Sequence, residues 1–336
     1  MIRLFTHTDL DGIGSSIISK ALKNYVPSFS LVDITYCEPN TINDEVRKFI
    51  SEKQYMHYTD IFITDLSVCK DVASKIDEIN KESKEHRFTL LDHHKTAEYL
   101  NEYEWATVSC EEQISGESYN SIFKHSGTSL FYTYISTTYG NFIPGILNTK
   151  LKEFTELVRL YDTWEWSTLK NSTIRNYSYN MNTLLKIYDR DKFIDTMVTR
   201  IITAPVAVRW SWWFDDVDTE LLELEYSRNE KYIKDVVDGK IHLCNDNDGN
   251  TFGLVFAEKC INDISTYVSD NYMGIDYVAI VSMSNRTVSL RTRYDNVDVS
   301  VIAKRNGGGG HKQSSGFVIN DEMMNLFIRS ITNLIK

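Results

Sequence analysis

Short apolar runs alternate with amphipathic segments over the first half of the chain. The runs are rich in β-branched and aromatic residues and predict strands at 2–6, 31–36, 61–64 and 88–91. The amphipathic segments have helical spacing and predict helices near 13–25, 42–50 and 72–79. This order is typical of an α/β domain with a mainly parallel sheet flanked by helices.

The pattern changes in the second half of the chain. Two more helices are predicted near 129–139 and 151–161, and Ser126-Gly127-Thr128 is interpreted only as the N-cap of the first. A second set of short strands is predicted at 241–244, 251–257, 277–282 and 287–292, followed by helices near 299–305 and at the end. We therefore expect three parts: an α/β domain at 1–165, a helical connection at 166–238 and a smaller α/β domain at 239–336.

Composition narrows the class of protein. A chain of 336 residues that is 42% hydrophobic can bury a large core. A net charge of −11 argues against binding of long duplex nucleic acid. No apolar stretch is long enough for a membrane span, and no signal-peptide pattern opens the chain, so we expect a cytoplasmic protein with no membrane partner. The five cysteines form no CxxC pair, which argues against a thiolate zinc site.

Carboxylates and imidazoles follow three of the predicted strands. His7, Asp9 and Asp11 alternate, so they project to one side of an extended segment. Asp65 and the run Asp92–His94 directly follow two further strands, and ligands gather at the carboxyl ends of strands in such sheets. An N-cap role would explain one such aspartate, but the whole set would repel itself unless cations held it.

A further carboxylate, Asp162, ends one of the predicted helices. It lies near the apolar side formed by Phe154 and Val158, so a buried ligand is favoured over a surface aspartate at a helix end. Oxygen and imidazole ligands without thiolate suit Mn²⁺ or Mg²⁺. The sequence therefore predicts a divalent metal site in the first domain.

Four consecutive glycines occupy 307–310, between a predicted helix and a predicted strand. Glycine weakens both kinds of element, and a flexible linker is unexpected at this place. Backbone N–H groups of Gly308, Gly309 and Gly310 could instead approach an anion closely, with His311 beside it. Six basic and two acidic residues lie between Arg286 and Lys312, so positive charge is concentrated locally.

These segments together resemble a known family. "HTDLDG", "ITDLS", "LLDHHKT" and "LVRLYDTWEW" occur in the order and spacing of the four motifs of the DHH phosphoesterases. "SLRTR" and the later "VDVSVIAKRNGGGGHKQSSGF" resemble their DHHA1 domain. The first four motifs are most similar to the NrnB type of oligoribonuclease (nanoRNase). The resemblance implies a DHH domain at 1–165 and a DHHA1 domain at 239–336 across a cleft.

The resemblance also implies roles for individual residues. Two Mn²⁺ ions, with Mg²⁺ as the alternative, would be held by six side chains: His7 and Asp9 on the first, Asp11, His93 and Asp162 on the second, and Asp65 between them. Asp92 would orient a histidine, and His94 would face the substrate phosphate or the leaving group. Arg291 matches the family's phosphate-binding arginine.

The predicted activity is hydrolysis of short oligoribonucleotides to mononucleotides by a hydroxide that two metals activate. An alternative is a phosphodiesterase or phosphatase for small nucleotides: linear dinucleotides, cyclic mononucleotides or 3′-phosphoadenosine 5′-phosphate. A non-catalytic nucleotide-binding module is a third. The resemblance favours attack from the 3′ end. The sequence leaves open the preferred substrate length and the preference for RNA or DNA. It also leaves open the oligomeric state, with a homodimer as one alternative.

Overall fold

The computed structural model describes residues 1–83, 87–116, 119–204, 213–310 and 312–335. The chain divides into two compact units, Met1–Leu222 and Glu223–Lys336. Each has its own sheet and its own buried core. No helix among these residues is both long enough and apolar enough to cross a bilayer.

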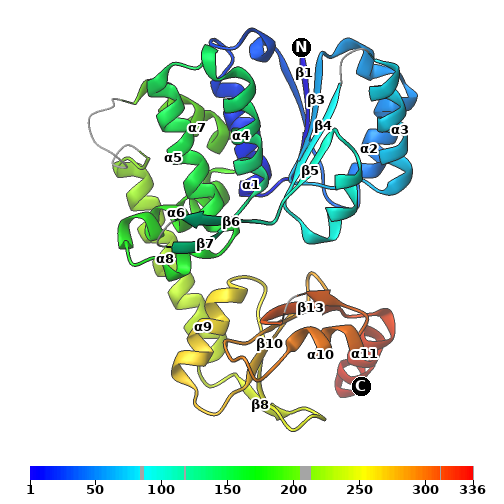
Figure 1. The fold of residues 1–336 in the computed structure, drawn as a ribbon. Coiled ribbons are helices and arrows are strands. Elements are labelled where there is room, and N and C mark those ends of the chain that lie inside the picture. The colour runs from blue at the N-terminus through cyan, green and yellow to red at the C-terminus, as the bar shows by residue number, and fades with distance from the viewer. Residues whose placement is uncertain (84–86, 117–118, 205–212, 311, 336) are drawn as a thin grey trace. The chain divides into compact units, whose positions relative to one another are not determined.

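A five-stranded parallel sheet forms the centre of the first unit (Figure 1). The strand order is β2-β1-β3-β4-β5, with β1 at Ile2–Thr6, β2 at Val32–Tyr36, β3 at Asp60–Thr64, β4 at Phe88–Asp92 and β5 at Ala106–Val108. The central strands β1, β3 and β4 are mainly apolar and buried because helices cover both faces, whereas the edge strand β2 is only partly buried. The carboxyl ends are level, since Thr6 pairs with Thr64 and Thr64 pairs with Leu91.

Helices cover the two faces of this sheet unequally. On one face lie α2 (Ile42–Ser51) and α3 (Lys70–Glu82), whose apolar sides form a core with the strands (Figure 1). On the other lie α1 (Leu10–Ala21) and α4 (Gly127–Tyr139), with α5 (Gly145–Asp162) packed against both. The second layer on this side consists of α6 (Ser172–Tyr188) and α7 (Arg190–Thr203), which contact α1 and α5 within the first unit.

Shorter elements complete the first unit. The hairpin β6–β7 joins β5 to α4, and single helical turns cover several loops; these elements are β6 (Glu111–Gly116), β7 (Tyr119–Lys124), η1 (Pro27–Ser30), η2 (Gln54–His57), η3 (Lys95–Glu102), η4 (Gly140–Phe142) and η5 (Glu165–Thr168). The helix α8 (Asp216–Val237) crosses the boundary between the units.

The second unit has a mixed sheet in the order β12-β13-β11-β10-β9-β8. Only β9 and β10 are parallel, and the other pairs are antiparallel. The strands are β8 (His242–Asn245), β9 (Thr251–Phe256), β10 (Tyr277–Ser282), β11 (Thr287–Arg291), β12 (Gly309–Gly310) and β13 (Ser314–Val318). The helices are α9 (Ile261–Asn271), α10 (Val299–Arg305) and α11 (Asp321–Ile335).

The expected fold class, a helix-flanked parallel sheet with a separate C-terminal sheet domain, is confirmed. Every predicted strand and helix is present, with ends that differ by a few residues. The sequence analysis missed β5, the hairpin β6–β7 and α9. Three residues of β5 are too short a run to show alternation, and α9 mixes polar and apolar residues closely.

Candidate metal centre

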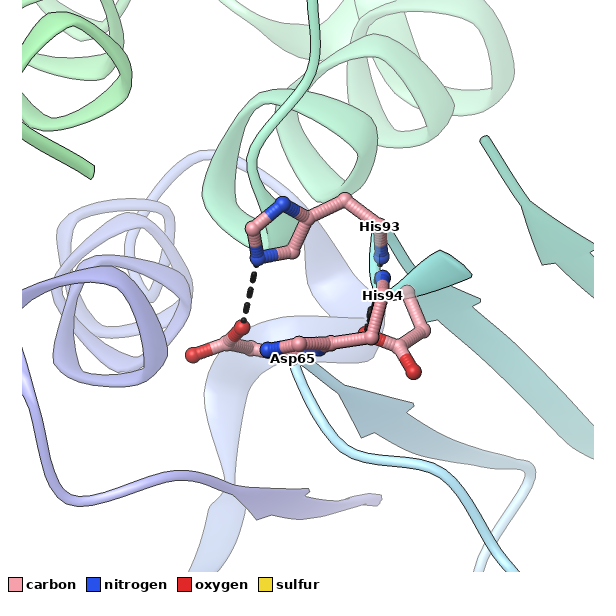
Figure 2. A group of neighbouring side chains, drawn as sticks. Asp65, His93 and His94 are labelled. Carbon is pink, nitrogen blue, oxygen red and sulfur yellow. Dashed lines mark hydrogen bonds and ion pairs between the residues drawn. The ribbon is translucent and has the colours of Figure 1, made fainter. Parts of the chain in front are cut away.

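The loops that follow β1, β3 and β4 meet at one edge of the sheet, where the strand ends are level. Asp65, His93 and His94 lie together there (Figure 2). Asp65 has a φ of 57°, in the left-handed region that aspartate enters more readily than most residues. This sharp turn ends β3 and places the Asp65 carboxylate among the side chains from the neighbouring loops.

The first group at this edge contains His7, Asp9 and Asp65. Nδ1 of His7 lies 3.0 Å from Oδ2 of Asp9 and 3.7 Å from Oδ2 of Asp65. The other ring nitrogen of His7 lies 3.3 Å from a carboxylate oxygen of Glu38. A histidine whose second nitrogen is held by a carboxylate is a common arrangement around metal ions.

Asp9 has two roles in the structure. Its Oδ1 accepts a hydrogen bond from the backbone N–H of Gly12 at 3.0 Å and so caps the start of α1. Its Oδ2 faces His7. The N-cap interpretation and the metal-ligand interpretation of this aspartate are therefore compatible, because each uses a different oxygen.

The second group contains Asp11, His93 and Asp162. Nε2 of His93 lies near a carboxylate oxygen of three aspartates: 3.2 Å from Oδ1 of Asp65, 3.5 Å from Oδ2 of Asp162 and 3.7 Å from Oδ2 of Asp11. Asp65 thus turns one oxygen toward His7 and the other toward His93. It is a member of the first group and lies beside the histidine of the second.

Asp11 is only 2% exposed and is held by the start of α4. Its oxygens accept from the backbone N–H groups of Gly127 at 2.5 Å and Thr128 at 2.9 Å. The Thr128 hydroxyl also donates to the backbone carbonyl of Asp11. A Cβ on Gly127 would lie 2.5 Å from Cβ of Asp65, so only glycine allows this approach.

These contacts correct one sequence interpretation. Ser126 does cap α4, in a reciprocal capping box with Ser129, as predicted. For the same segment the cap alone was preferred to an approach to the site, yet the backbone N–H groups of Gly127 and Thr128 donate to Asp11. An N-cap signal cannot show this, because the partner lies more than a hundred residues earlier in the chain. Glu38 was also missed, although it follows β2 as the other acids follow their strands.

Asp92 is fully buried and orients His94. One Asp92 oxygen accepts from Nδ1 of His94 at 2.7 Å and from the backbone N–H of His93 at 2.8 Å. The carboxylate raises the pKa of His94. The His94 side chain is 53% exposed, so its ring can be reached from solvent while its other side is held.

Burial and the close approach of carboxylates and imidazoles shift the pKa values at this edge. The carboxylates of Asp65 and Asp9 raise the pKa of His7 to about 11. Burial lowers the pKa of His93, but Asp65 and the charges of Asp11 and Asp162 outweigh it and raise the value to about 10. Burial chiefly raises the pKa of Asp162 to about 6 and that of Asp11 well above its usual range. Positive charge is therefore strongly favoured here.

The donor atoms fit divalent cations. Oδ2 of Asp65 is buried and has no hydrogen-bond partner among the described residues, and the same holds for Nδ1 of His7. A buried carboxylate oxygen without a donor is costly unless a cation or a water binds it. The set consists of carboxylates and imidazoles, which suit Mn²⁺ and Mg²⁺. Asp65, Asp92, His93 and His94 also lie close enough together to form such a group.

The residues predicted to bind substrate lie in the second unit. Arg291, in β11, donates from Nε to Oδ1 of Asn262 at 2.8 Å and from Nη1 to the carbonyl of Ser315 at 3.3 Å. Burial lowers the pKa of Arg291. Gly310 pairs with Ser315 in β13, which pairs in turn with Leu290 in β11. Arg291 and the glycines therefore lie on strands that both pair with β13.

The glycines have a packing role that the sequence analysis did not foresee. A Cβ on Gly308 would lie 2.1 Å from the carbonyl oxygen of Gly316, and Gly310 has a φ of 130°. Gly309 has nothing within 4 Å of a built Cβ and so has open space. An anion site at this turn stays a prediction, and His311 lies outside the described residues.

Comparisons with known proteins agree with this geometry. The model of the DHH family, N-terminal domain, matches residues 1–158. "Oligoribonuclease NrnB" of Bacillus subtilis is 34% identical over 334 residues, covering 98% of this chain and 75% of that protein. An uncharacterized protein, R106, of Acanthamoeba polyphaga mimivirus is 25% identical over 244 residues, covering 68% of this chain and 47% of that protein.

Solved structures show the same fold. RecJ in complex with Mn²⁺ from Thermus thermophilus matches with a TM-score of 0.53 at 10% identity, over 98% of this chain and 51% of that chain. The pGpG-specific phosphodiesterase PggH of Vibrio cholerae matches with a TM-score of 0.51 at 14% identity, over 100% of this chain and 99% of that chain. At these identities the likeness concerns the fold alone.

Binding of Mn²⁺ is expected to release protons. At pH 7 His7 and His93, two of the predicted ligands, are expected to be protonated without metal, because their pKa values are about 11 and about 10. Metal ligands must be deprotonated, so about two protons should leave per protein and the affinity should rise from pH 6 to pH 8. Isothermal titration calorimetry in buffers of different ionisation enthalpy measures the number released. A binding enthalpy that is the same in every buffer would contradict the assignment.

Proposed function

As a member of the DHH family, this chain is a metal-dependent phosphoesterase, and we propose that it is a Mn²⁺-dependent exonuclease that hydrolyses short oligoribonucleotides to mononucleotides. One observation carries the proposal: Asp65 turns one carboxylate oxygen toward His7 of the first group and the other toward His93 of the second. The 34% identity to an oligoribonuclease supports short RNA as the substrate class.

We assign the ligands as follows. His7 and Asp9 would hold one cation, Asp11, His93 and Asp162 the other, and Asp65 would contact both. When bound, two divalent cations supply Lewis acidity, which lowers the pKa of water and offsets negative charge on the phosphate. The backbone N–H groups of α4 keep Asp11 oriented, and Glu38 keeps His7 oriented, whether or not a cation is bound.

His94 is the proposed proton donor. Its Nδ1 is held by the buried carboxylate of Asp92, which raises the pKa of the ring. Nε2 of an exposed, protonated ring can donate to a phosphate oxygen or to the leaving oxygen. Asp92 itself does not face the substrate, because it is fully buried.

We propose that residues 239–336 bind the substrate as a DHHA1-like domain. Arg291 would contact phosphate through the guanidinium edge that its bonds to Asn262 and Ser315 leave available. The backbone of Gly308–Gly310 would contact the same end of the oligonucleotide, with His311 nearby. Positive charge confined to this region would explain how an acidic protein binds a short polyanion.

The function can be tested with an end-labelled RNA pentamer and Mn²⁺. We expect a stepwise ladder that ends in mononucleotides, and the ladder will also show the direction of digestion. A linear dinucleotide and 3′-phosphoadenosine 5′-phosphate are assayed in parallel. An intact pentamer beside rapid cleavage of either small substrate would overturn the oligoribonuclease proposal in favour of a small-nucleotide phosphoesterase.

Asp65→Asn should abolish activity and leave the fold intact. The amide keeps the shape but removes the charge that both ligand groups share, so turnover should fall by more than about 100-fold. Without metal the Tm should stay close to that of the unmodified protein, because buried negative charge is also relieved. Thermal denaturation with and without Mn²⁺ measures both effects. A variant that is still stabilised by Mn²⁺ and fully active would rule out the shared role of Asp65.

Arg291→Ala should chiefly weaken capture of the substrate. We expect KM for the pentamer to rise about tenfold or more with a smaller change in kcat, since a charged contact to phosphate is lost. Arg286→Ala is the matched control, because Arg286 belongs to the same basic segment but is exposed and paired with Asp321. Equal kinetics for the two variants would show that Arg291 does not contact the substrate.

A further inference from the structure

Aromatic side chains cluster directly after the ligand Asp162. The ring of Trp166 lies at the centre, with centroids 5.4 Å from Trp164, 5.0 Å from Tyr179 and 6.2 Å from Tyr161. Tyr161 and Trp166 are nearly parallel, at 13°. Trp164, Trp166, Tyr161 and Tyr179 are called the aromatic platform below.

Trp164 differs from the other members because it is 51% exposed. Packing explains Trp166 and Tyr179, whose rings are partly covered by their neighbours. Packing does not explain why Trp164, a large and mainly apolar side chain, is exposed to solvent. An exposed aromatic ring beside a reactive centre is available to a ligand.

The backbone that holds Trp164 is unusual. Its φ is 61°, in the left-handed region that bulky residues rarely enter, so the surrounding structure must impose it. Thr163 and the buried Arg159 both bind the carboxylate of Glu165, which closes the turn around Trp164. The hydroxyl of Ser167 donates to the carbonyl of Trp164 at 2.8 Å. These bonds fix the turn before any ligand arrives.

The platform is also adjacent to the proposed metal ligands. The N–H of Trp164 donates to the carbonyl of Tyr161 at 3.2 Å, so Trp164 begins within one turn of Asp162. The Asp162 carboxylate lies 3.5 Å from His93. Trp164 is thus two residues from a proposed ligand, with the two Cα atoms at most about 7 Å apart, a separation that one nucleotide can span. In a nucleotide the base and the phosphate are joined by a single sugar.

We propose that Trp164 is a stacking surface for the nucleobase next to the scissile phosphate. The inference rests on the function proposed above and adds that the substrate must carry a nucleobase next to the scissile phosphate. Every nucleobase has a π-face, so stacking favours nucleotides over phosphoesters without a base and discriminates little among the four bases. The rigid turn lets the ring accept a base with little loss of conformational entropy.

Base removal from the substrate provides the test. Steady-state kinetics with Mn²⁺ are compared for an RNA trimer and for versions in which each nucleotide in turn is abasic. Trp164→Leu should raise KM for the normal trimer about tenfold, because one base loses its stacking partner. Trp164→Phe should restore most of the affinity. For the trimer that is abasic at the stacked position, Trp164→Leu should have no effect.

A matched control comes from Phe142, which is 57% exposed in the same unit. It lies beyond the far end of α4, a helix of 13 residues or about 20 Å that starts at the metal centre. Phe142→Leu should leave the kinetics of every trimer unchanged. A similar loss in this variant would show that the effect of Trp164→Leu is not specific to the platform.

Two outcomes would overturn the inference. One is an equal loss on the normal and all abasic trimers, which would mean that Trp164 acts through the fold or through Asp162. The other is full activity of Trp164→Leu. If the unmodified protein cleaves no oligonucleotide, the proposed function fails separately, and calorimetric binding of AMP against ribose 5-phosphate then tests the platform. Equal affinity for the two compounds would overturn it.

Discussion

Mutual repulsion among buried carboxylates is the constraint on which the first unit depends. Asp11, Asp65 and Asp162 come from three distant segments and meet at one edge of a parallel sheet, where burial and the charge of Asp65 raise the pKa of Asp11 and of Asp162. Protein groups offset part of this charge. The N-terminus of α4 and the protonated forms of His7 and His93 do so without metal. The same arrangement favours bound cations.

The second unit contains a local group of basic residues, between Arg286 and Lys312, in a chain whose net charge is −11. Its strands bring Arg291 and the glycine turn to neighbouring positions by pairing with β13. The guanidinium is restrained by Asn262 and by a carbonyl group rather than by a carboxylate, so its charge is not neutralised by a close partner. A restrained cation without an acidic partner differs from Arg286, Arg293 and Arg305, which all form ion pairs.

Local patterns in the sequence predicted most of the elements, but not β5, the hairpin β6–β7 or α9, and they singled out the proposed ligands. Strand-terminal acids such as Asp65 were found because parallel strands end at one edge, a rule that needs no knowledge of packing. Contacts between distant segments could not be found in this way. The hydrogen bond from Gly127 to Asp11 and the close approach of Gly308 to Gly316 depend on tertiary structure. The exposure of Trp164 depends on it as well. Glu38 follows the end of β2, so the same rule could have identified it, but it was not considered.

The double role of Asp9 has a consequence for how this site would change over evolutionary time. One of its oxygens caps α1 and the other faces His7, so selection for stability alone would preserve it. Asp162 ends its helix without a comparable capping bond in the described residues, and its carboxylate faces His93 at the proposed metal centre. In a lineage that lost catalysis, Asp162 should drift first and Asp9 last. A descendant that keeps Asp9 is therefore weak evidence for an active enzyme, whereas one that keeps Asp162 is strong evidence.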